Sequence, residues 1–207
     1  MGLQHYFSSD PDKRARFIFN FIAPIYGMLG TSVERNFESS IDILENYISV
    51  EGKDVMDLGT GTGAWAANFK SRGASKVVGV DFAGKMLNQA KNNYPNMEFL
   101  QGDAENLEQF ADNSFDIVTA SFVLHGVKED KRANMLREMY RVSRKHIVIH
   151  DFIGETPLFV RLLEFMERSD YKFFKQNFCK ELELHFGNAK KISTKSGVGI
   201  YIAEKQT

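Results

Sequence analysis

An apolar run that ends in three alternating glycines constrains the fold of this chain more than any other feature. The run covers Val55 to Leu58, glycines follow at positions 59, 61 and 63, and a helical pattern begins directly after them. A strand that turns sharply into a helix is typical of open α/β sheets, which bind ligands beyond the carboxyl ends of their strands. Glycine adopts positive φ and lets a ligand lie against the main chain. The sequence therefore predicts an α/β fold with a ligand site at this turn.

Strands and helices alternate along the chain as far as residue 152. Several of the strands are apolar throughout, as expected where helices cover both faces of a sheet. Such alternation predicts a doubly wound, Rossmann-like sheet of parallel strands with helices on both faces. Strands are expected at residues 53–59, 76–81, 97–101, 115–121 and 146–152, and helices at about 33–50, 63–73, 84–94 and 130–142.

The remaining residues follow a different pattern. Helices are expected at 158–166 and 178–185, and two strands, at 190–195 and 199–205, meet across a short turn. Two β-patterned runs joined in this way predict a hairpin. We expect the hairpin to form an antiparallel edge of the same sheet, within a single domain of 207 residues.

Charge and cysteine content limit the classes of partner. The chain has 26 basic and 27 acidic side chains, whereas a nucleic-acid-binding domain usually carries a basic excess. Its one cysteine, Cys179, allows neither an intramolecular disulfide nor a cysteine-based metal cluster. No N-terminal run resembles a signal peptide, and no segment has the roughly 20 apolar residues that span a bilayer. We therefore expect a cytoplasmic protein without an integral membrane segment, a metal site or a nucleic-acid partner.

Two ligand classes suit a glycine-rich turn of this kind. Dinucleotide-binding folds use G-x-G-x-x-G, whereas this turn reads G-x-G-x-G, with Asp57 two residues before the first glycine. The carboxylate of Asp57 would repel a pyrophosphate and would attract a ligand that carries an ammonium group beside a sulfonium. This charge argument favours S-adenosylmethionine over NAD, and a glycine turn without any ligand is the remaining alternative.

Two further aspartates follow expected strands. Asp81 stands 22 residues after Gly59, a distance at which an acidic residue accepts the ribose hydroxyls of a nucleotide. Asp103 follows the third strand and is placed to accept from an adenine amino group, while the Ala104 N–H meets a ring nitrogen. Aspartate after a strand also caps the segment that follows it, so each position has a structural alternative.

Five segments in order carry a family resemblance, namely DLGTGTG, VVGVDFAGKML, FLQGDAENL, FDIVTASFVLHGV and LREMYRVSR. They resemble the motif series of the class I S-adenosylmethionine-dependent methyltransferases, over about residues 17–205. Near the N-terminus, FNFIAPIYGML resembles a segment of the ubiquinone/menaquinone C-methyltransferase-like group. The resemblance implies seven strands in the order 3-2-1-4-5-7-6, with the last strand antiparallel. It also implies that Tyr26 and its neighbours fold over the cofactor as a lid.

The resemblance adds a set of expected cofactor contacts to those argued above. The cofactor is expected to be S-adenosyl-L-methionine, released as S-adenosyl-L-homocysteine. Residues 51–152 would form the cofactor-binding core, residues 1–50 the lid and first helices, and residues 153–207 the acceptor-side helices and hairpin. The residues expected at the cofactor are Tyr26, Asp57, Gly59, Thr60, Gly61, Gly63, Asp81, Phe82, Met86, Asp103, Ala104 and Ser121.

The methyl acceptor is less constrained than the cofactor. The chain departs from the quinone group at Gly27, at FVLHG (residues 122–126) and in lacking a glycine turn before the fifth strand. The expected reaction is methyl transfer to a small-molecule acceptor. A quinone-precursor C-methyltransferase and a non-catalytic S-adenosylmethionine-binding module are the alternatives. The acceptor atom and the oligomeric state stay open.

Candidates for acid–base chemistry follow the fourth and fifth strands. His125 is the candidate catalytic residue, with a histidine that packs or bonds locally in its loop as the alternative. His150 alternates with apolar residues and is expected to be a satisfied interior histidine, whereas Asp151 is either a substrate contact or a cap. The aromatic residues between Phe152 and Phe178 would line an acceptor pocket or pack as an amphipathic helix on the sheet.

Overall fold

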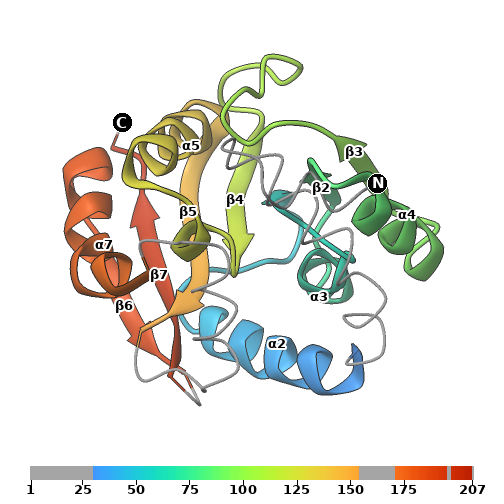
Figure 1. Cartoon of the computed structure of the whole chain (residues 1–207). Coiled ribbons are helices and arrows are strands. Elements are labelled where there is room, and N and C mark those ends of the chain that lie inside the picture. The colour runs from blue at the N-terminus through green and yellow to red at the C-terminus, as the bar shows by residue number, and fades with distance from the viewer. Residues whose placement is uncertain (1–29, 154–170, 195–196, 207) are drawn as a thin grey trace, which may run out of the picture.

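The computed structural model describes residues 30–153, 171–194 and 197–206, which are built around one seven-stranded sheet (Figure 1). The strand order is β3-β2-β1-β4-β5-β7-β6. Strands β1 to β5 run parallel, whereas β7 is antiparallel to both β5 and β6. The order and the antiparallel last strand confirm the prediction from the sequence. The strands are β1 (Asp54–Leu58), β2 (Lys76–Asp81), β3 (Glu98–Gln101), β4 (Phe115–Ser121), β5 (Ser143–Phe152), β6 (Lys190–Ser193) and β7 (Val198–Glu204).

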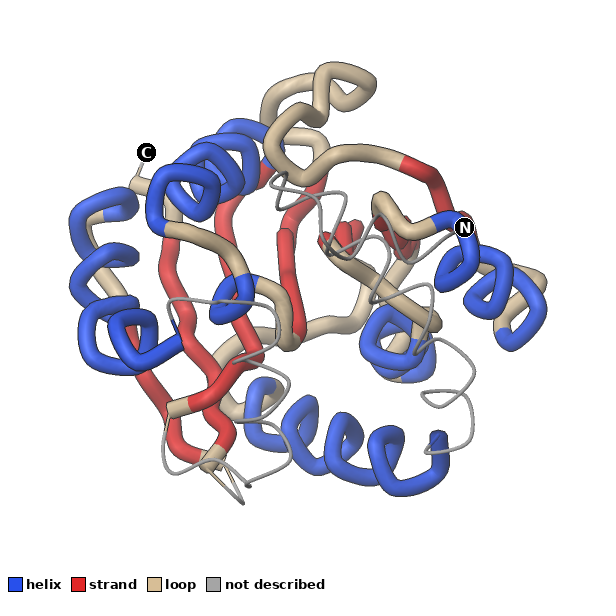
Figure 2. The backbone as a smooth tube through the Cα atoms, in the orientation of Figure 1, coloured by secondary structure: helices blue, strands red, loops and turns tan. Residues whose placement is uncertain are grey.

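Helices cover both faces of this sheet (Figure 2). Apolar side chains of α5 and α7 form one buried cluster with the strands, and those of α2, α3 and α4 form a second cluster. None of the helices described is long and apolar enough to cross a membrane. The helices are α2 (Gly30–Leu44), α3 (Ala64–Ser71), α4 (Gly84–Asn93), α5 (Glu129–Val142) and α7 (Tyr171–Phe186), with a short 3-10 turn, η2 (Leu124–Gly126).

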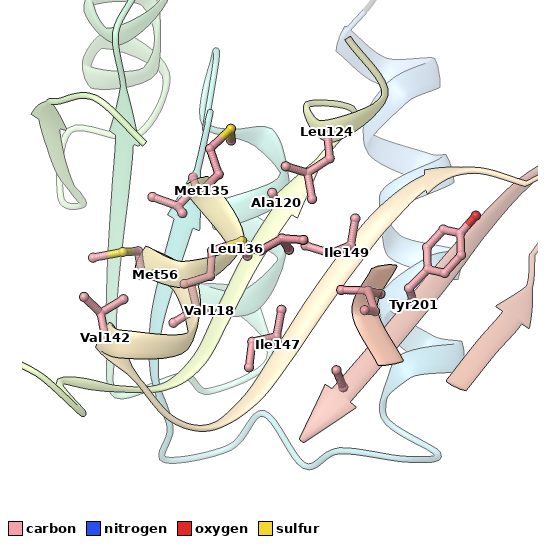
Figure 3. Close-up of a cluster of buried hydrophobic side chains, with 14 of the residues drawn as sticks. Met56, Val118, Ala120, Leu124, Met135, Leu136, Val142, Ile147, Ile149 and Tyr201 are labelled. Carbon is pink, nitrogen blue, oxygen red and sulfur yellow. The ribbon is translucent and has the colours of Figure 1, made fainter. Parts of the chain in front are cut away.

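Successive residues of the central strands serve opposite clusters. Ile147 and Ile149 of β5 belong to the cluster with α5 and α7, whereas Val148 belongs to the cluster with α2 and α3. Figure 3 shows the first cluster, with Met135 and Leu136 of α5 over the sheet. Because both faces are covered, consecutive residues such as 147–149 of β5 are all apolar. The faces of the sheet are therefore closed, and its carboxyl edge is left for a ligand.

Several element boundaries differ from the predicted ones, among them the end of α2 and the start of β5. Helix α2 ends at Leu44, although Ile48 is still buried in the turn that follows, so the apolar spacing continues after the helix has stopped. Strand β5 begins at Ser143, three residues before the predicted start at residue 146. The prediction missed these residues because 144–145 are charged and exposed, so the sequence has no apolar run there.

Helix α7 begins seven residues before the predicted start. Its residues Phe174 and Phe178 are fully buried, with ring centroids 4.3 Å apart, and both pack against Tyr201 of β7. For these two aromatic residues the amphipathic-helix alternative is the one the structure supports. The helix expected at 158–166 lies outside the described residues.

Candidate active site

The glycine-rich turn joins β1 to α3 at the carboxyl edge of the sheet. Gly59, Gly61 and Gly63 have φ angles of 67°, 55° and 86°. The N–H groups of Gly59 and Thr60 donate to the carbonyl oxygen of Val80 in β2, at 2.8 and 3.1 Å. The turn is thereby bound to the end of the neighbouring strand.

The three glycines have different surroundings. A Cβ atom at Gly59 would lie 2.5 Å from Cγ2 of Val123, and one at Gly63 would lie 2.8 Å from Cζ of Phe99. A Cβ atom at Gly61 would have its nearest neighbour, a backbone oxygen, at 4.0 Å. Gly61 therefore faces open space, whereas Gly63 is required by packing at the N-terminus of α3.

Asp81 connects the glycine turn with the start of α4. Its carboxylate accepts hydrogen bonds from the N–H of Gly61 at 2.8 Å and from the N–H of Ala83 at 2.7 Å. Burial raises the pKa of Asp81, and these backbone donors oppose the rise. A carboxylate has about four acceptor positions, so Asp81 can still accept from a ligand hydroxyl.

Asp57 lies behind the turn and is only 1% exposed. Neither of its carboxylate oxygens has a hydrogen-bond partner in the described part of the chain. Burial, together with the charge of Asp81, raises the pKa of Asp57 to about 7, although the nearby Thr60 hydroxyl and Ala66 N–H, which do not reach hydrogen-bond geometry, oppose the rise. A buried charged group without a partner is costly, and such groups are rare outside functional sites. Asp57 is therefore prepared to accept a donor or a cation that the protein itself does not supply.

A hollow lies beside the turn, at the carboxyl ends of β1, β2 and β3 and next to α5. Five residues expected at the cofactor line it, namely Gly59, Asp81, Phe82, Asp103 and Ala104. Asp103 also has the capping role named as its alternative, because its Oδ1 accepts from the N–H of Glu105 at 3.0 Å. The other residues that line the hollow are Val80, Gly102, Glu105, Val123, Val127, Lys131 and Met135.

The other residues expected at the cofactor do not line this hollow. Thr60 is buried beside Asp57, and Met86 is buried on α4. The hydroxyl of Ser121 forms a 2.9 Å hydrogen bond with Nδ1 of His150. Gly63 packs against Phe99, and Tyr26 lies outside the described residues.

A buried histidine–aspartate pair stands where β4 and β5 end. Nδ1 of His125 in η2 lies 2.7 Å from Oδ1 of Asp151, and the backbone N–H of His125 donates to Oδ2 at 3.3 Å. Asp151 is fully buried and also accepts from the N–H of Phe152 at 2.8 Å. An ionised carboxylate only accepts hydrogen bonds, so Nδ1 carries the proton. The other ring nitrogen of His125, Nε2, lies on the side of the ring away from Asp151.

Aromatic rings surround this pair. The His125 ring is edge-on to Phe122, Phe152 and Phe174, with centroid distances of 6.5, 4.9 and 6.3 Å. Apolar rings next to a histidine form a surrounding of low dielectric constant, in which its bond to Asp151 is strengthened.

His150 has a different surrounding from His125. Its Nδ1 and Nε2 lie 2.9 and 3.0 Å from the hydroxyls of Ser121 and Ser40, and its ring stacks on Trp65 at 4.6 Å. Burial lowers the pKa of His150 to about 3. His150 is thus the satisfied interior histidine that its place in an apolar strand predicts.

The contact between His125 and Asp151 was not predicted, although both residues were candidates. The available signal was their position, since they follow β4 and end β5, which are neighbours in the predicted strand order. The partnerless state of Asp57 was missed as well, because it depends on what surrounds the carboxylate. Among the described residues, no group of three or more His, Cys, Asp or Glu side chains gathers in a way that could bind a metal ion.

Comparison with known proteins gives consistent sequence relatives. Residues 55–146 match the family described as "Methyltransferase domain". The demethylmenaquinone methyltransferase of Renibacterium salmoninarum is 44% identical over 152 residues, which cover 70% of this chain and 61% of that protein. That of Paenarthrobacter aurescens is 43% identical over 149 residues, 69% of this chain and 56% of that protein. The chain thus spans about three fifths of the length of these relatives.

Solved structures support the same fold. Magnesium protoporphyrin IX methyltransferase from Synechocystis PCC 6803, solved with bound SAM, has a TM-score of 0.70 at 19% identity and covers 97% of this chain and 99% of its own. A SAM-dependent methyltransferase from Aquifex aeolicus has a TM-score of 0.68 at 18% identity, with 96% and 100% covered. Together with the motif series and the sheet order, these matches identify a class I S-adenosylmethionine-dependent methyltransferase domain, whose sequence relatives named above are demethylmenaquinone methyltransferases.

Proposed function

We propose that this chain binds S-adenosylmethionine and transfers its methyl group to a small-molecule acceptor. The observation that carries the proposal is Asp57, a buried carboxylate without a partner directly behind a glycine turn whose Gly61 faces open space. A ligand with an ammonium group would supply the missing partner, whereas a pyrophosphate would add a second negative charge. The residues present therefore fit S-adenosylmethionine and do not fit NAD.

Residues of the hollow and of the glycine turn beside it then have roles toward this cofactor. Asp57 is assigned to the ammonium end, Asp81 to the ribose hydroxyls, and Asp103 with the Ala104 N–H to the adenine edge. Gly61 allows the ligand to approach the main chain. When bound, S-adenosylmethionine supplies an activated methyl group, so the protein has to position the acceptor and exclude water. We assign this cofactor role to residues 51–152 of a single methyltransferase domain.

The pair formed by His125 and Asp151 favours an enzyme over a module that only binds the cofactor. Asp151 fixes the orientation of the ring, and the second ring nitrogen can take a proton from an acceptor hydroxyl as the methyl group is transferred. The aromatic rings of Phe122 and Phe152 suit a planar, apolar acceptor. Since the relatives are named demethylmenaquinone methyltransferases, a quinone precursor in its reduced, hydroxyl-bearing form is the acceptor to test first.

Calorimetric titration with S-adenosylmethionine, S-adenosylhomocysteine and NAD tests the cofactor. We expect binding of the two sulfur ligands alone. Formation of S-adenosylhomocysteine in the presence of reduced demethylmenaquinone then tests the reaction. Asp151→Asn should lower kcat by about 10²–10⁴-fold, the usual contribution of general acid–base catalysis, with unchanged affinity for S-adenosylhomocysteine.

Three results would contradict parts of the proposal. Binding of NAD, or no binding of either sulfur ligand, would overturn the cofactor assignment. Equal activity of the wild-type protein and the Asp151→Asn variant would leave the cofactor site standing but would remove His125 from the reaction.

A further inference from the structure

Arg132 is a charged side chain that is completely buried in the first turn of α5. Its guanidinium group forms two short hydrogen bonds with the carboxylate of Glu181 on α7, Nε to Oε2 at 2.6 Å and Nη2 to Oε1 at 2.7 Å. The third nitrogen, Nη1, donates to the carbonyl oxygen of Val127 at 2.8 Å and approaches that of Leu124 at 3.5 Å. One side chain thus joins α5, α7 and the residues at the two ends of η2.

The turn held in this way is the one that carries His125. η2 has only three residues, and Phe122, which precedes it, has a φ of 55°, a conformation that costs energy in a residue other than glycine. A turn this short supplies few backbone hydrogen bonds of its own. Its position therefore depends on side chains that bind it from outside: Asp151 accepts from the His125 N–H, and Arg132 donates to the carbonyls of Leu124 and Val127.

Stability alone does not account for an arginine at this place. The cost of removing two charges from water offsets most of their attraction, and apolar residues of similar volume often serve the fold as well. Arginine offers what such residues lack, five donors in a rigid planar fork that reach several acceptors at once. The Phe174 ring, 5.5 Å from Cζ of Arg132, is also 6.3 Å from the His125 ring, so α7 reaches the histidine by a second path.

We propose that Arg132 and Glu181 are positioning residues for His125. Their ion pair fixes η2 between α5 and α7, at the place where the imidazole meets Asp151. The positioning of His125 against Asp151 does not depend on the proposed function, because this contact exists without any ligand. Only the role of His125 toward an acceptor rests on the proposed function.

Proton NMR of the His125 ring tests this inference without an acceptor. The Nδ1–H proton that bonds to Asp151 is expected as a downfield, slowly exchanging signal, identified by its disappearance in His125→Gln. In Glu181→Gln, whose amide cannot accept from both guanidinium nitrogens, the signal should be lost or exchange about tenfold faster, because the turn opens more easily. Arg132→Lys should have the same effect, since one ammonium group cannot span Glu181 and both carbonyls.

Arg141→Lys is the matched control. Arg141 lies on the same helix and pairs with Glu138, but the carbonyls it binds belong to Leu107 and Phe110, far along the chain from η2. This variant disturbs an ion pair of the same helix and should keep the His125 signal.

An unchanged His125 signal in folded Glu181→Gln protein would overturn the inference, and so would the same loss in Arg141→Lys. If Arg132→Lys does not fold, the Glu181→Gln result decides. Titration with S-adenosylhomocysteine is run on the same samples. Failure of the wild-type protein to bind it would count against the proposed function and would leave the NMR result as it stands.

Discussion

Gly61 and Gly63 stand two residues apart in one turn, and both have positive φ, yet a methyl group should act differently at the two positions. At Gly61 the added Cβ atom meets open space, so the variant Gly61→Ala should fold, with a cost of about 1–2 kcal/mol for the backbone conformation. At Gly63 the Cβ atom would collide with the rings of Phe99 and Tyr94.

We predict that Gly61→Ala weakens binding of S-adenosylhomocysteine by at least about tenfold, because the methyl group occupies ligand space, whereas Gly63→Ala mainly lowers Tm. Calorimetry and thermal unfolding of both variants measure the two effects separately. Full affinity in Gly61→Ala would mean that the ligand lies elsewhere.

Asp57 connects stability with pH. Its pKa of about 7 in the folded protein exceeds the ordinary value of 3.8, so between these values the folded chain holds a proton that the unfolded chain has lost. The free energy of unfolding therefore falls as pH rises through this window. The substitution Asp57→Asn should raise the free energy of unfolding by about 1–3 kcal/mol at pH 8 and leave this free energy nearly unchanged below pH 4. The same variant should bind S-adenosylhomocysteine more weakly by about 1.5–3 kcal/mol.

The control for Asp57→Asn is Asp116→Asn, which should change the free energy of unfolding at pH 8 in the opposite direction. Although burial raises the pKa of Asp116, the N–H of Asp54 and the side chain of Arg144 together hold it below its usual value. Its replacement should lower stability at pH 8. Urea unfolding at several pH values measures both, and a destabilised Asp57→Asn protein at pH 8 would show that the carboxylate has a partner after all.

Helix α5 holds the loop after β3 with one polar face. Residues three and four apart on a helix share a face. Glu105 of this loop pairs with Lys131 and Asn134. The Leu107 N–H donates to Glu138, and the Leu107 carbonyl oxygen accepts from Arg141. The four helix residues are Lys131, Asn134, Glu138 and Arg141. The loop that contributes Asp103, Ala104 and Glu105 to the hollow is therefore fixed by a helix, so we expect the affinity of the site to depend on α5.

We predict a pH-dependent role for Glu138. Its hydrogen bond with Arg141 lowers the pKa of Glu138, so its contribution to stability is present above the ordinary value of 4.5 and is lost as pH falls through the lower, folded-state pKa. Glu138→Gln should cost about 1–2 kcal/mol at pH 7 and little at pH 3, as measured by urea unfolding. An equal cost at both pH values would assign the effect to shape instead of charge.

The elements were largely predictable because local patterns encode them. The strands of the parallel sheet are apolar runs between helical patterns, and the glycine turn marks the edge at which a ligand can bind. Contacts between distant segments were not predictable in the same way. Arg132 has the sequence appearance of an exposed helical residue, and its partner Glu181 is 49 positions further along the chain. Arg132 is buried because α7 packs against α5, and the local sequence pattern of α5 does not predict this packing.

At the scale of the whole molecule, β7 holds the C-terminal half of the sheet together. Ile200, Tyr201 and Ile202 are buried and serve both core clusters, and β7 pairs with β5 on one side and with β6 on the other. Each large buried side chain contributes about 2 kcal/mol. A chain that stops at Gly197 should therefore show no cooperative urea transition, whereas one that stops at Lys205 should unfold like the full chain. A cooperative transition in the shorter chain would contradict this central role.

The position of β7 also has a consequence for the time course of folding. A ribosome makes β7 after the other six strands, yet the sheet needs it between two strands that are already made. Until then β5 presents an unpaired edge, a hazard for association with other chains. Translation speed over the last segment and access to chaperones should therefore influence the yield of native protein more than substitutions at the surface of the early strands.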